Sequence, residues 1–335
     1  MAKIKDIAQA TGLSIATISK YINGGSLREY NRIAIEKAIE KLGGYEANEI
    51  ARGLKTNRTM TLGVLLPELD SLFSTTIVSR MQSQLQGFGY STIISEYGTA
   101  PGGIHRQMDF LLRKKVDGVI CQPLYGDGSF LKNALQKNIP VVLIDRLVDS
   151  VDCDAVIIDN EKATFKATEH LIRMGHRKIG IITGPMEIYT PRKRYEGFAS
   201  AMSEYGIEVK NEYTAVCNMR VEGGYQALCS LVEKDDAPTA IIAINYDMTL
   251  GAVIAANERN LRIGEDISIV GFDDMIMLRL VQPPLTVVAQ PMEMIADRAA
   301  QLLLNRLNDN KCESREVVVL STRLNIRESV RKMPD

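Results

Sequence analysis

Apolar residues at the start of the chain recur at helical spacing in two short segments. Ile4, Ile7 and Ala8 mark the first segment, and Ile18 and Ile22 mark the second. Helices this short are marginal in water on their own, so they must pack against other parts of the chain. The pattern therefore predicts two short amphipathic helices within a small helical domain.

A Gly-Leu-Ser sequence separates the two predicted helices. Gly12 can adopt the positive φ that ends a helix, and the Ser14 hydroxyl can cap the helix that follows. Two helices packed across such a turn form either a helix-turn-helix, whose second helix can enter a DNA major groove, or an ordinary helical hairpin. The spacing alone leaves the two alternatives equally open.

Two more helical segments complete the first sixty residues. Residues 29–42 form a third predicted helix, in which Ile35, Ile39 and Leu42 share one side and would close a three-helix core. Residues 48–56 read as a short polar helix that begins with an asparagine cap. This last segment is too short and too polar to be stable alone.

From residue 61 onward, short apolar segments alternate with amphipathic ones. We expect strands at residues 62–66, 91–95, 118–121, 141–144, 155–158, 178–182, 240–244 and 267–270. We expect helices near residues 74–87, 103–114, 128–137, 160–174, 192–205, 221–233, 247–259 and 291–308. Strands that alternate with helices imply parallel sheets with right-handed connections. For a chain of 335 residues, two such halves are a better fit than one very wide sheet.

Charge is distributed unevenly along the chain. The formal net charge of −1 taken alone argues against a nucleic-acid partner. Residues 1–58, however, contain ten Lys and Arg against six Asp and Glu, so this segment carries +4 and the remainder −5. A basic head on an acidic body suits a protein in which only the head contacts phosphate.

Composition and motifs do not favour a secreted protein, a membrane protein or an enzyme. The five cysteines are scattered without a CxxC motif, which is typical of reduced thiols rather than of a disulfide framework or a zinc site. The N-terminal residues lack the apolar core of a signal peptide, and no apolar run is long enough for a membrane span. No serine, cysteine or histidine constellation indicates catalysis, so we expect no enzyme activity, no metal and no cofactor. We expect a cytoplasmic protein.

The N-terminal segment closely resembles the DNA-binding headpiece of the lactose-repressor/galactose-repressor (LacI/GalR) family of bacterial transcription regulators. The matching residues are IKDIAxxxGLSxATISxxING over residues 4–24, Arg32, Ile35, the AIEKLG run at 38–43, and Asn48-x-x-Ala51-Arg52-x-Leu54. The rest of the chain resembles the sugar-binding body of the same family, which is akin to periplasmic ribose-type receptors. The resemblance favours the helix-turn-helix over the ordinary hairpin.

This resemblance implies an α/β fold with three parts. They are a three-helix helix-turn-helix headpiece (1–46), a hinge helix and linker (47–59), and a body for effector binding and dimerisation (60–335). The body would resemble type I periplasmic binding proteins, with two parallel sheets in two lobes. Lobe one is expected at about 60–158 and 290–318, and lobe two at about 159–289 and 319–330. The chain would return to the first lobe near Gln290 and to the second near the C-terminus.

The family pattern assigns DNA contacts to the second helix and to the hinge. The residues implied are Ser14, Ile15, Ala16, Thr17, Ser19, Lys20, Asn23, Asn48, Ala51, Arg52, Leu54 and Lys55. Ile15 and Ala16 can contact thymine methyl groups. Ile15 could instead be a core residue, but Ile18 and Ile22 already fill the inner face, which favours exposure.

The hinge is expected to become ordered only on DNA. The Leu54 side chain would insert into the minor groove and kink a palindromic operator at its centre, although an ordinary packing role is the alternative. Two residues depart from the family pattern. Lys20 stands where the family often has an arginine that reads guanine, and Ala47 stands where a proline is common.

The family pattern also places effector-binding residues at the strand ends of the body. They are Leu72, Phe73, Asp145, Arg146, Asn160, Arg194, Asn245, Tyr246, Asp273 and Gln290. The arginine of the Arg194-x-x-Gly-Phe motif can bond ring hydroxyls or a carboxylate, and surface charge is the alternative reading. Tyr246 takes the place of an acidic residue, and Asp247, one position later, would point about 100° away on a helix.

That exchange bears on the chemistry of the effector. With one carboxylate removed and Arg146, Arg192 and Arg194 available, an anionic sugar derivative becomes a hypothesis beside a neutral sugar. The effector class is therefore a sugar, a sugar acid or a sugar phosphate.

The sequence as a whole predicts a DNA-binding transcription regulator, most simply a repressor of carbohydrate-utilisation genes. It would bind a palindromic operator as a homodimer and respond to an effector that changes lobe closure. Two other classes compete with this prediction. A sugar receptor without DNA would need a signal peptide and no basic head, and an enzyme has only the α/β architecture in its favour.

Overall fold

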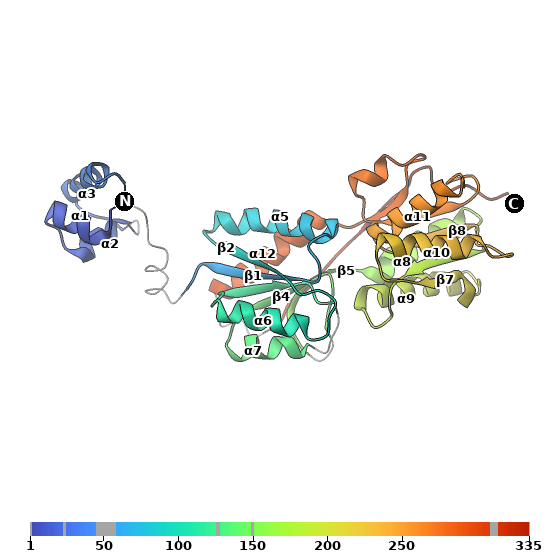
Figure 1. The fold of residues 1–335 in the computed structure, drawn as a ribbon, viewed down its shortest axis with the longest axis horizontal. Coiled ribbons are helices and arrows are strands. Elements are labelled where there is room, and N and C mark those ends of the chain that lie inside the picture. The colour runs from blue at the N-terminus through green and yellow to red at the C-terminus, as the bar shows by residue number, and fades with distance from the viewer. Residues whose placement is uncertain are drawn as a thin grey trace. The chain divides into compact units, whose positions relative to one another are not determined.

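A computed structural model describes residues 2–22, 25–44, 58–124, 128–148, 151–308 and 314–334. The chain divides into two compact units, Met1–Met60 and Thr61–Asp335. Figure 1 shows the three helices of the first unit and the two sheets of the second, which we call the body.

The N-terminal unit is a small three-helix domain. Its helices are α1 (Ile4–Thr11), α2 (Ile15–Ile22) and α3 (Glu29–Lys41). Ile7, Ile18 and Ile35, one from each helix, are fully buried against one another, and Ala38 joins them. The prediction that Leu42 completes the core is wrong. The helix ends at Lys41, so Leu42 is the C-cap residue and lies 37% exposed.

The turn between α1 and α2 has the predicted chemistry. Gly12 adopts a φ of 69° after the last residue of α1, where a side chain would be strained. The Ser14 hydroxyl accepts a hydrogen bond from the Thr17 backbone N–H at 3.1 Å and so caps α2. Both predictions from the Gly-Leu-Ser sequence are confirmed.

The body contains two six-stranded sheets. The first has the order β11-β5-β4-β3-β1-β2 and the second β12-β10-β9-β8-β6-β7. The strands of the first sheet are β1 (Thr61–Leu66), β2 (Ser91–Glu96), β3 (Gly118–Cys121), β4 (Val141–Ile144), β5 (Asp154–Ile158) and β11 (Val317–Leu320). Those of the second are β6 (Ile179–Thr183), β7 (Thr214–Val216), β8 (Ala240–Ala243), β9 (Ser268–Phe272), β10 (Thr286–Ala289) and β12 (Arg323–Asn325). All neighbouring strands are parallel except β12, which runs antiparallel to β10.

Helices cover the sheets in two sets, which define lobe one and lobe two (Figure 1). Lobe one has α5 (Leu72–Gly87), α6 (Gly103–Arg113), α7 (Lys132–Gln136) and α12 (Met292–Asn308). Lobe two has α8 (Asn160–Arg173), α9 (Tyr189–Glu204), α10 (Val221–Val232) and α11 (Tyr246–Glu258). Short 3-10 helices lie at Ser129–Leu131 and Asn211–Tyr213, and a third, η3, at Ile276–Arg279. The predicted α/β class with two mainly parallel sheets is confirmed.

The chain crosses between the lobes three times, after β5, after β10 and after β11. The second crossing lies at Gln290 and the third just before β12. The eight expected strands all occur, but β7, β10, β11 and β12 were missed. Of these, β7 and β12 are only three residues long and partly exposed at sheet edges, so their apolar signal is weak.

Candidate functional site

The outer face of α2 is open to solvent. Ile15 is 52% exposed, and Ala16 and Lys20 are exposed beside it, whereas Ile18 on the opposite side has no exposed surface. The predicted exposure of Ile15 is confirmed.

Two hydroxyl groups at the start of α2, those of Ser14 and Thr17, take part in the helix cap. The Ser14 and Thr17 hydroxyls lie 2.8 Å apart in a mutual hydrogen bond, and Ser19 is half-buried. The remaining predicted DNA contacts lie outside the described residues. They are Asn23, Asn48, Ala51, Arg52, Leu54 and Lys55.

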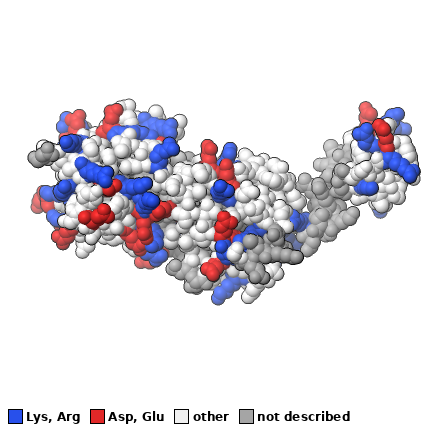
Figure 2. Space-filling view, turned by 180° about the vertical axis from the view of Figure 1, so that it is seen from behind, with Lys and Arg blue, Asp and Glu red and all other residues white. Residues whose placement is uncertain are grey.

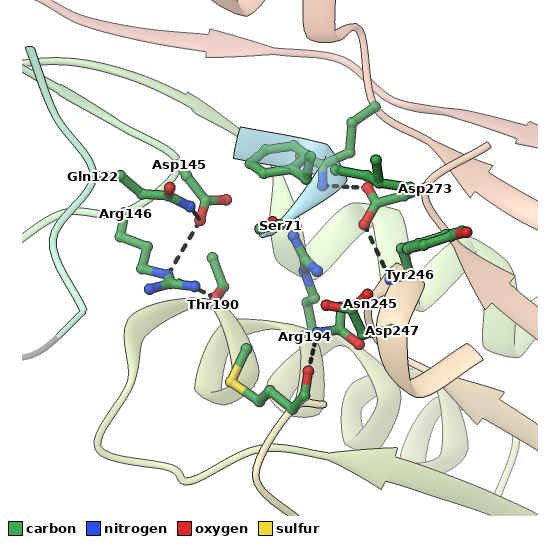
Figure 3. Close-up of a pocket in the computed structure, with 14 residues that line it drawn as sticks. Ser71, Gln122, Asp145, Arg146, Thr190, Arg194, Asn245, Tyr246, Asp247 and Asp273 are labelled. Carbon is green, nitrogen blue, oxygen red and sulfur yellow. Dashed lines mark hydrogen bonds and ion pairs between the residues drawn. The ribbon is translucent and has the colours of Figure 1, made fainter. Parts of the chain in front are cut away.

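A polar pocket lies between the two lobes of the body (Figure 3). Nine of the ten predicted effector residues line it: Leu72, Phe73, Asp145, Arg146, Arg194, Asn245, Tyr246, Asp273 and Gln290. The other lining residues, which the sequence did not reveal, are Ser71, Gln122, Thr190, Met219 and Asp247. Most of these directly follow a strand or neighbour a predicted residue, a weak signal that many surface residues share.

Two carboxylates reach the pocket from equivalent backbone positions. Asp145 directly follows β4 and Asp273 directly follows β9, with φ angles of 70° and 68°. Positive φ is uncommon for a residue with a side chain, although Asp tolerates it better than most. Such outliers are often found where function fixes the backbone, and here both turn a carboxylate toward the space between the lobes.

Asp145 belongs to a buried network that joins the lobes. Arg146 Nε lies 3.1 Å from Asp145 Oδ2 and donates to Thr190 Oγ1, in lobe two, at 3.2 Å. Gln122 Nε2 donates to the same carboxylate at 3.0 Å. The Arg146 guanidinium thus already has an anionic partner.

Arg194 is fully enclosed by lobe two. Its Nε donates to Asn160 Oδ1 at 2.8 Å, its Nη1 donates to the Ile244 carbonyl, and its guanidinium lies 3.9 Å from the centre of the Phe272 ring. Asn160 itself is buried behind Arg194 and does not line the pocket. Asn160 therefore contacts the Arg194 side chain rather than the pocket.

Close packing of α9 on α8 fixes where Arg194 lies. A Cβ at Gly197 would overlap the Glu161 carbonyl oxygen, so only glycine allows the two helices to approach this closely. The packing therefore accounts for the glycine of the Arg-x-x-Gly motif.

Asp273 accepts two hydrogen bonds in the floor of the pocket. Gln290 Nε2 donates to Oδ1 at 2.7 Å, and the Tyr246 backbone N–H donates to Oδ2 at 3.2 Å. Burial raises the pKa of Asp273 to about 6, against the opposing effect of Arg194. The other amide atom, Gln290 Oε1, is buried and has no hydrogen-bond partner among the described residues.

A third carboxylate, that of Asp247, lines the pocket beside Asp145 and Asp273. Tyr246 is 6% exposed, and its neighbour Asp247 lines the same pocket (Figure 3). The expectation that Asp247 points elsewhere is wrong, because the pocket wraps around the first turn of α11 and receives both positions. Arg192, which the sequence offered as a third cation, is not among the lining residues.

An ion-pair cluster bridges the lobes next to this pocket. Arg220 of lobe two contacts Glu68 at 2.6 Å and Asp70 at 2.8 Å, and both carboxylates follow β1 in lobe one. Burial raises the pKa of Asp247, and Arg220 opposes that shift. The bridge therefore lies within electrostatic reach of the pocket.

On the face of the body shown in Figure 2, positive and negative side chains are interspersed rather than gathered by sign. Within the described residues, no three His, Cys, Asp or Glu side chains are grouped as a metal ion would require. No helix in that part of the chain has the length and apolarity to cross a membrane. Four cysteines, Cys121, Cys153, Cys217 and Cys229, are free thiols.

Known proteins resemble the chain along nearly its whole length. Residues 168–330 match the model of the periplasmic binding protein-like domain family. The chain is 32% identical over 334 residues to the HTH-type transcriptional repressor PurR of Pasteurella multocida (strain Pm70), with 99% of each chain covered. A structure of the lac repressor dimer bound to operator and the anti-inducer ONPF matches with a TM-score of 0.88 and 25% identity, covering 98% of this chain and 99% of that one. The complex of the transcriptional regulator CelR with cellobiose matches with a TM-score of 0.75 and 27% identity, covering 98% and 100%. The chain belongs to the LacI/GalR family of bacterial transcription regulators.

Proposed function

We propose that this protein is a homodimeric repressor of carbohydrate-utilisation genes. It binds a palindromic operator through its N-terminal unit and is controlled by a sugar or sugar derivative between the lobes of its body. The observation that carries the proposal is the exposed face of α2, where Ile15, Ala16 and Lys20 lie over a well-packed three-helix core. A helix displayed in this way has the geometry that major-groove readers use.

The dimer is supported by an exposed apolar cluster on lobe two. Ile276, Met277 and Leu280, on and next to η3, are 74%, 48% and 69% exposed. Large apolar side chains that gather on a surface usually mark an interface. We assign this cluster to a second copy of the chain, because a palindromic operator requires a two-fold partner and the similar lac repressor structure is described as a dimer.

The pocket supports a small polar effector. Its walls offer the carboxylates of Asp145 and Asp273, the buried guanidinium of Arg194 and the aromatic side chains of Phe73 and Tyr246. Sugars present hydroxyl groups and apolar ring faces to walls of this kind. The CelR structure, described as a complex with cellobiose, shows that a similar body binds a carbohydrate.

The charge balance of the pocket argues against the acidic effectors. Three carboxylates line it against two guanidinium groups, and Arg146 is already paired with Asp145. Only Arg194, whose hydrogen bonds go to the neutral acceptors Asn160 Oδ1 and the Ile244 carbonyl, would remain to meet an added anion, and the charges of Asp273 and Asp145 already act on it. Among the three effector classes, a sugar without an acidic group is therefore the best fit.

Control would pass through lobe closure. The Arg146–Thr190 and Arg220–Glu68 contacts join the lobes only when the lobes are close together. An effector that binds the closed and open forms unequally shifts that equilibrium, and with it the distance between the two hinges of a dimer. Leu54 of each subunit would insert into the operator in only one of the two forms, closed or open.

A selection from random DNA followed by gel shifts at several salt concentrations tests the DNA role. We expect enrichment of a palindrome with a flexible central step. We also expect Ile15→Ala to weaken its binding by about tenfold, about 1.4 kcal/mol for the lost base contacts. Ile33→Ala, which removes an isoleucine of similar exposure from α3, is the matched control. A sugar receptor or an enzyme would show no sequence-dependent binding at moderate salt, and that result would refute the proposal.

A further inference from the structure

We infer that the natural effector carries a protonated amine beside its hydroxyl groups, as an amino sugar does, and that Asp247 binds that amine. This inference rests on the proposed function, since it concerns the ligand of the same pocket. It follows from which hydrogen-bonding atoms of the pocket are already used and which are left for a ligand.

The atoms left over include acceptors that only a donor can satisfy. Gln290 Nε2 is committed to Asp273, which leaves Gln290 Oε1 buried and without a hydrogen-bond partner in the described part of the chain. Gln290 itself is 91% buried and lines the pocket. A buried amide oxygen without a donor costs free energy, so a ligand that donates a hydrogen bond there would be favoured.

Asp247 is the second acceptor that remains available. Among the described residues, none donates a hydrogen bond to its carboxylate, although it lines the pocket and is half-buried. Asp145 and Asp273 differ from it, because each already accepts two or more polar contacts. Asp247 is therefore the pocket carboxylate with the most capacity for a cation.

Neighbouring charges do not neutralise Asp247. Arg220, the cation whose charge acts on Asp247, is held by two carboxylates of lobe one, Glu68 and Asp70. That cluster has one more negative than positive charge, and the pocket itself has three carboxylates against two guanidinium groups. Both regions thus have excess negative charge, which attracts a cation and repels an anion.

An ammonium group matches this arrangement better than a hydroxyl group does. It has three donors and no acceptor, so it can bond Asp247 without creating an unmet acceptor of its own. Hydrogen bonds between charged partners are also about twice as strong as neutral ones. The hydroxyl groups of the same ligand would serve the remaining carboxylate oxygens and Gln290 Oε1.

The test is a calorimetric and thermal-shift panel on the full-length chain at pH 7. The probes are glucosamine, galactosamine and mannosamine, each beside its neutral parent hexose, its N-acetyl derivative and its 6-phosphate. We expect one amino sugar to bind at least about tenfold more tightly than both its parent and its N-acetyl form, because a hydrogen bond to a charged group is worth roughly that factor. Asp247→Asn should remove most of that preference. Asp235→Asn, the same change at an exposed position in lobe two, should leave the preference unchanged.

The outcomes separate this inference from the function beneath it. If a neutral, N-acetylated or phosphorylated sugar binds best, the inference of an amine bound by Asp247 is wrong. The same holds if Asp247→Asn leaves the preference for the amino sugar intact. In both cases the proposed effector role of the pocket stands. If no amino sugar binds, the inference that the effector carries an amine is likewise wrong. Only if no compound binds and operator affinity is also unaffected by all of them does the proposed effector control fail.

Discussion

Replacing Asp273 by asparagine should stabilise the body at neutral pH while it abolishes effector binding. Asp273 is fully enclosed, and burial raises its pKa from 3.8 to about 6. The ionised carboxylate is therefore less stable in the folded protein than in the unfolded chain. At pH 7 the native protein is therefore less stable than it would be with an uncharged side chain at this position.

The expected gain follows from linkage. Because the folded pKa lies above the ordinary value, the stabilising contribution of this carboxyl is full below pH 3.8 and is lost as the pH rises through about 6. The shift corresponds to about 3 kcal/mol at pH 7. Asparagine keeps one of the two acceptors that Gln290 and the Tyr246 N–H now use, and the lost hydrogen bond costs about 1 kcal/mol. A net gain of about 2 kcal/mol, or roughly 4–8 °C in the Tm of the body, should remain.

Thermal unfolding of the two proteins at pH 7 and pH 5 measures this effect. The variant should be more stable at pH 7, and its advantage should shrink at pH 5, where the native carboxyl is mostly protonated. The neighbouring residue, Asp274, supplies a control for which the expected change in Tm has the opposite sign. Hydrogen bonds from Arg327 and Asn325 lower the pKa of Asp274 although burial acts the other way, so Asp274→Asn should reduce the Tm at pH 7.

A lower Tm for Asp273→Asn at pH 7, or an equal change in Tm at both pH values, would show that the charge of Asp273 does not destabilise the folded body. Either result would mean that Arg194 and the two hydrogen bonds stabilise the ionised Asp273 by more than its burial costs. The charge of Asp273 would then stabilise the folded body, and its position in the pocket would be weaker support for a role in effector binding.

Three further predictions concern packing and interfaces. Ile18→Ala should unfold the N-terminal unit, since removing a fully buried large side chain costs about 2–5 kcal/mol, whereas Ile15→Ala should leave its circular dichroism unchanged. Arg220→Ala should favour lobe opening by up to about fivefold, because two partly exposed ion pairs contribute about 1 kcal/mol together, as spin labels on the two lobes would report. Arg259→Ala, which breaks an ion pair within lobe two, should have no such effect. Leu280→Asp should shift the protein from dimer to monomer in light scattering, and an unchanged mass would refute the assigned interface.

The elements that the sequence predicted well are those with a strong local signal. The eight apolar strands and the glycine turn at Gly12 depend on burial and on backbone sterics, which act within a few residues. The short edge strands β7 and β12 were missed because pairing partners far away in the chain create them. Leu42 was misplaced because the helix ended one residue before the periodicity would have buried it.

The pocket was predicted in outline through the family resemblance, but its charge was not. The sequence indicated that Tyr246 had replaced a carboxylate, and a helical wheel placed Asp247 about 100° away. The structure has both residues at the pocket, where they form the first two positions of α11. Likewise, the sequence indicated that Arg146 was available to a ligand, but its contacts with Asp145 and Thr190 depend in part on lobe packing that no local pattern encodes.

If the pocket controls DNA binding, a sugar bound there must change operator affinity, which fluorescence anisotropy measures. The native chain and Asp273→Asn would each be titrated onto the selected palindrome, with and without the sugar that binds best in the panel. We expect the sugar to change the operator Kd of the native chain at least about tenfold, in either direction, and to leave the Kd of the variant unchanged. An operator Kd that is the same with and without a sugar bound in the pocket would contradict it.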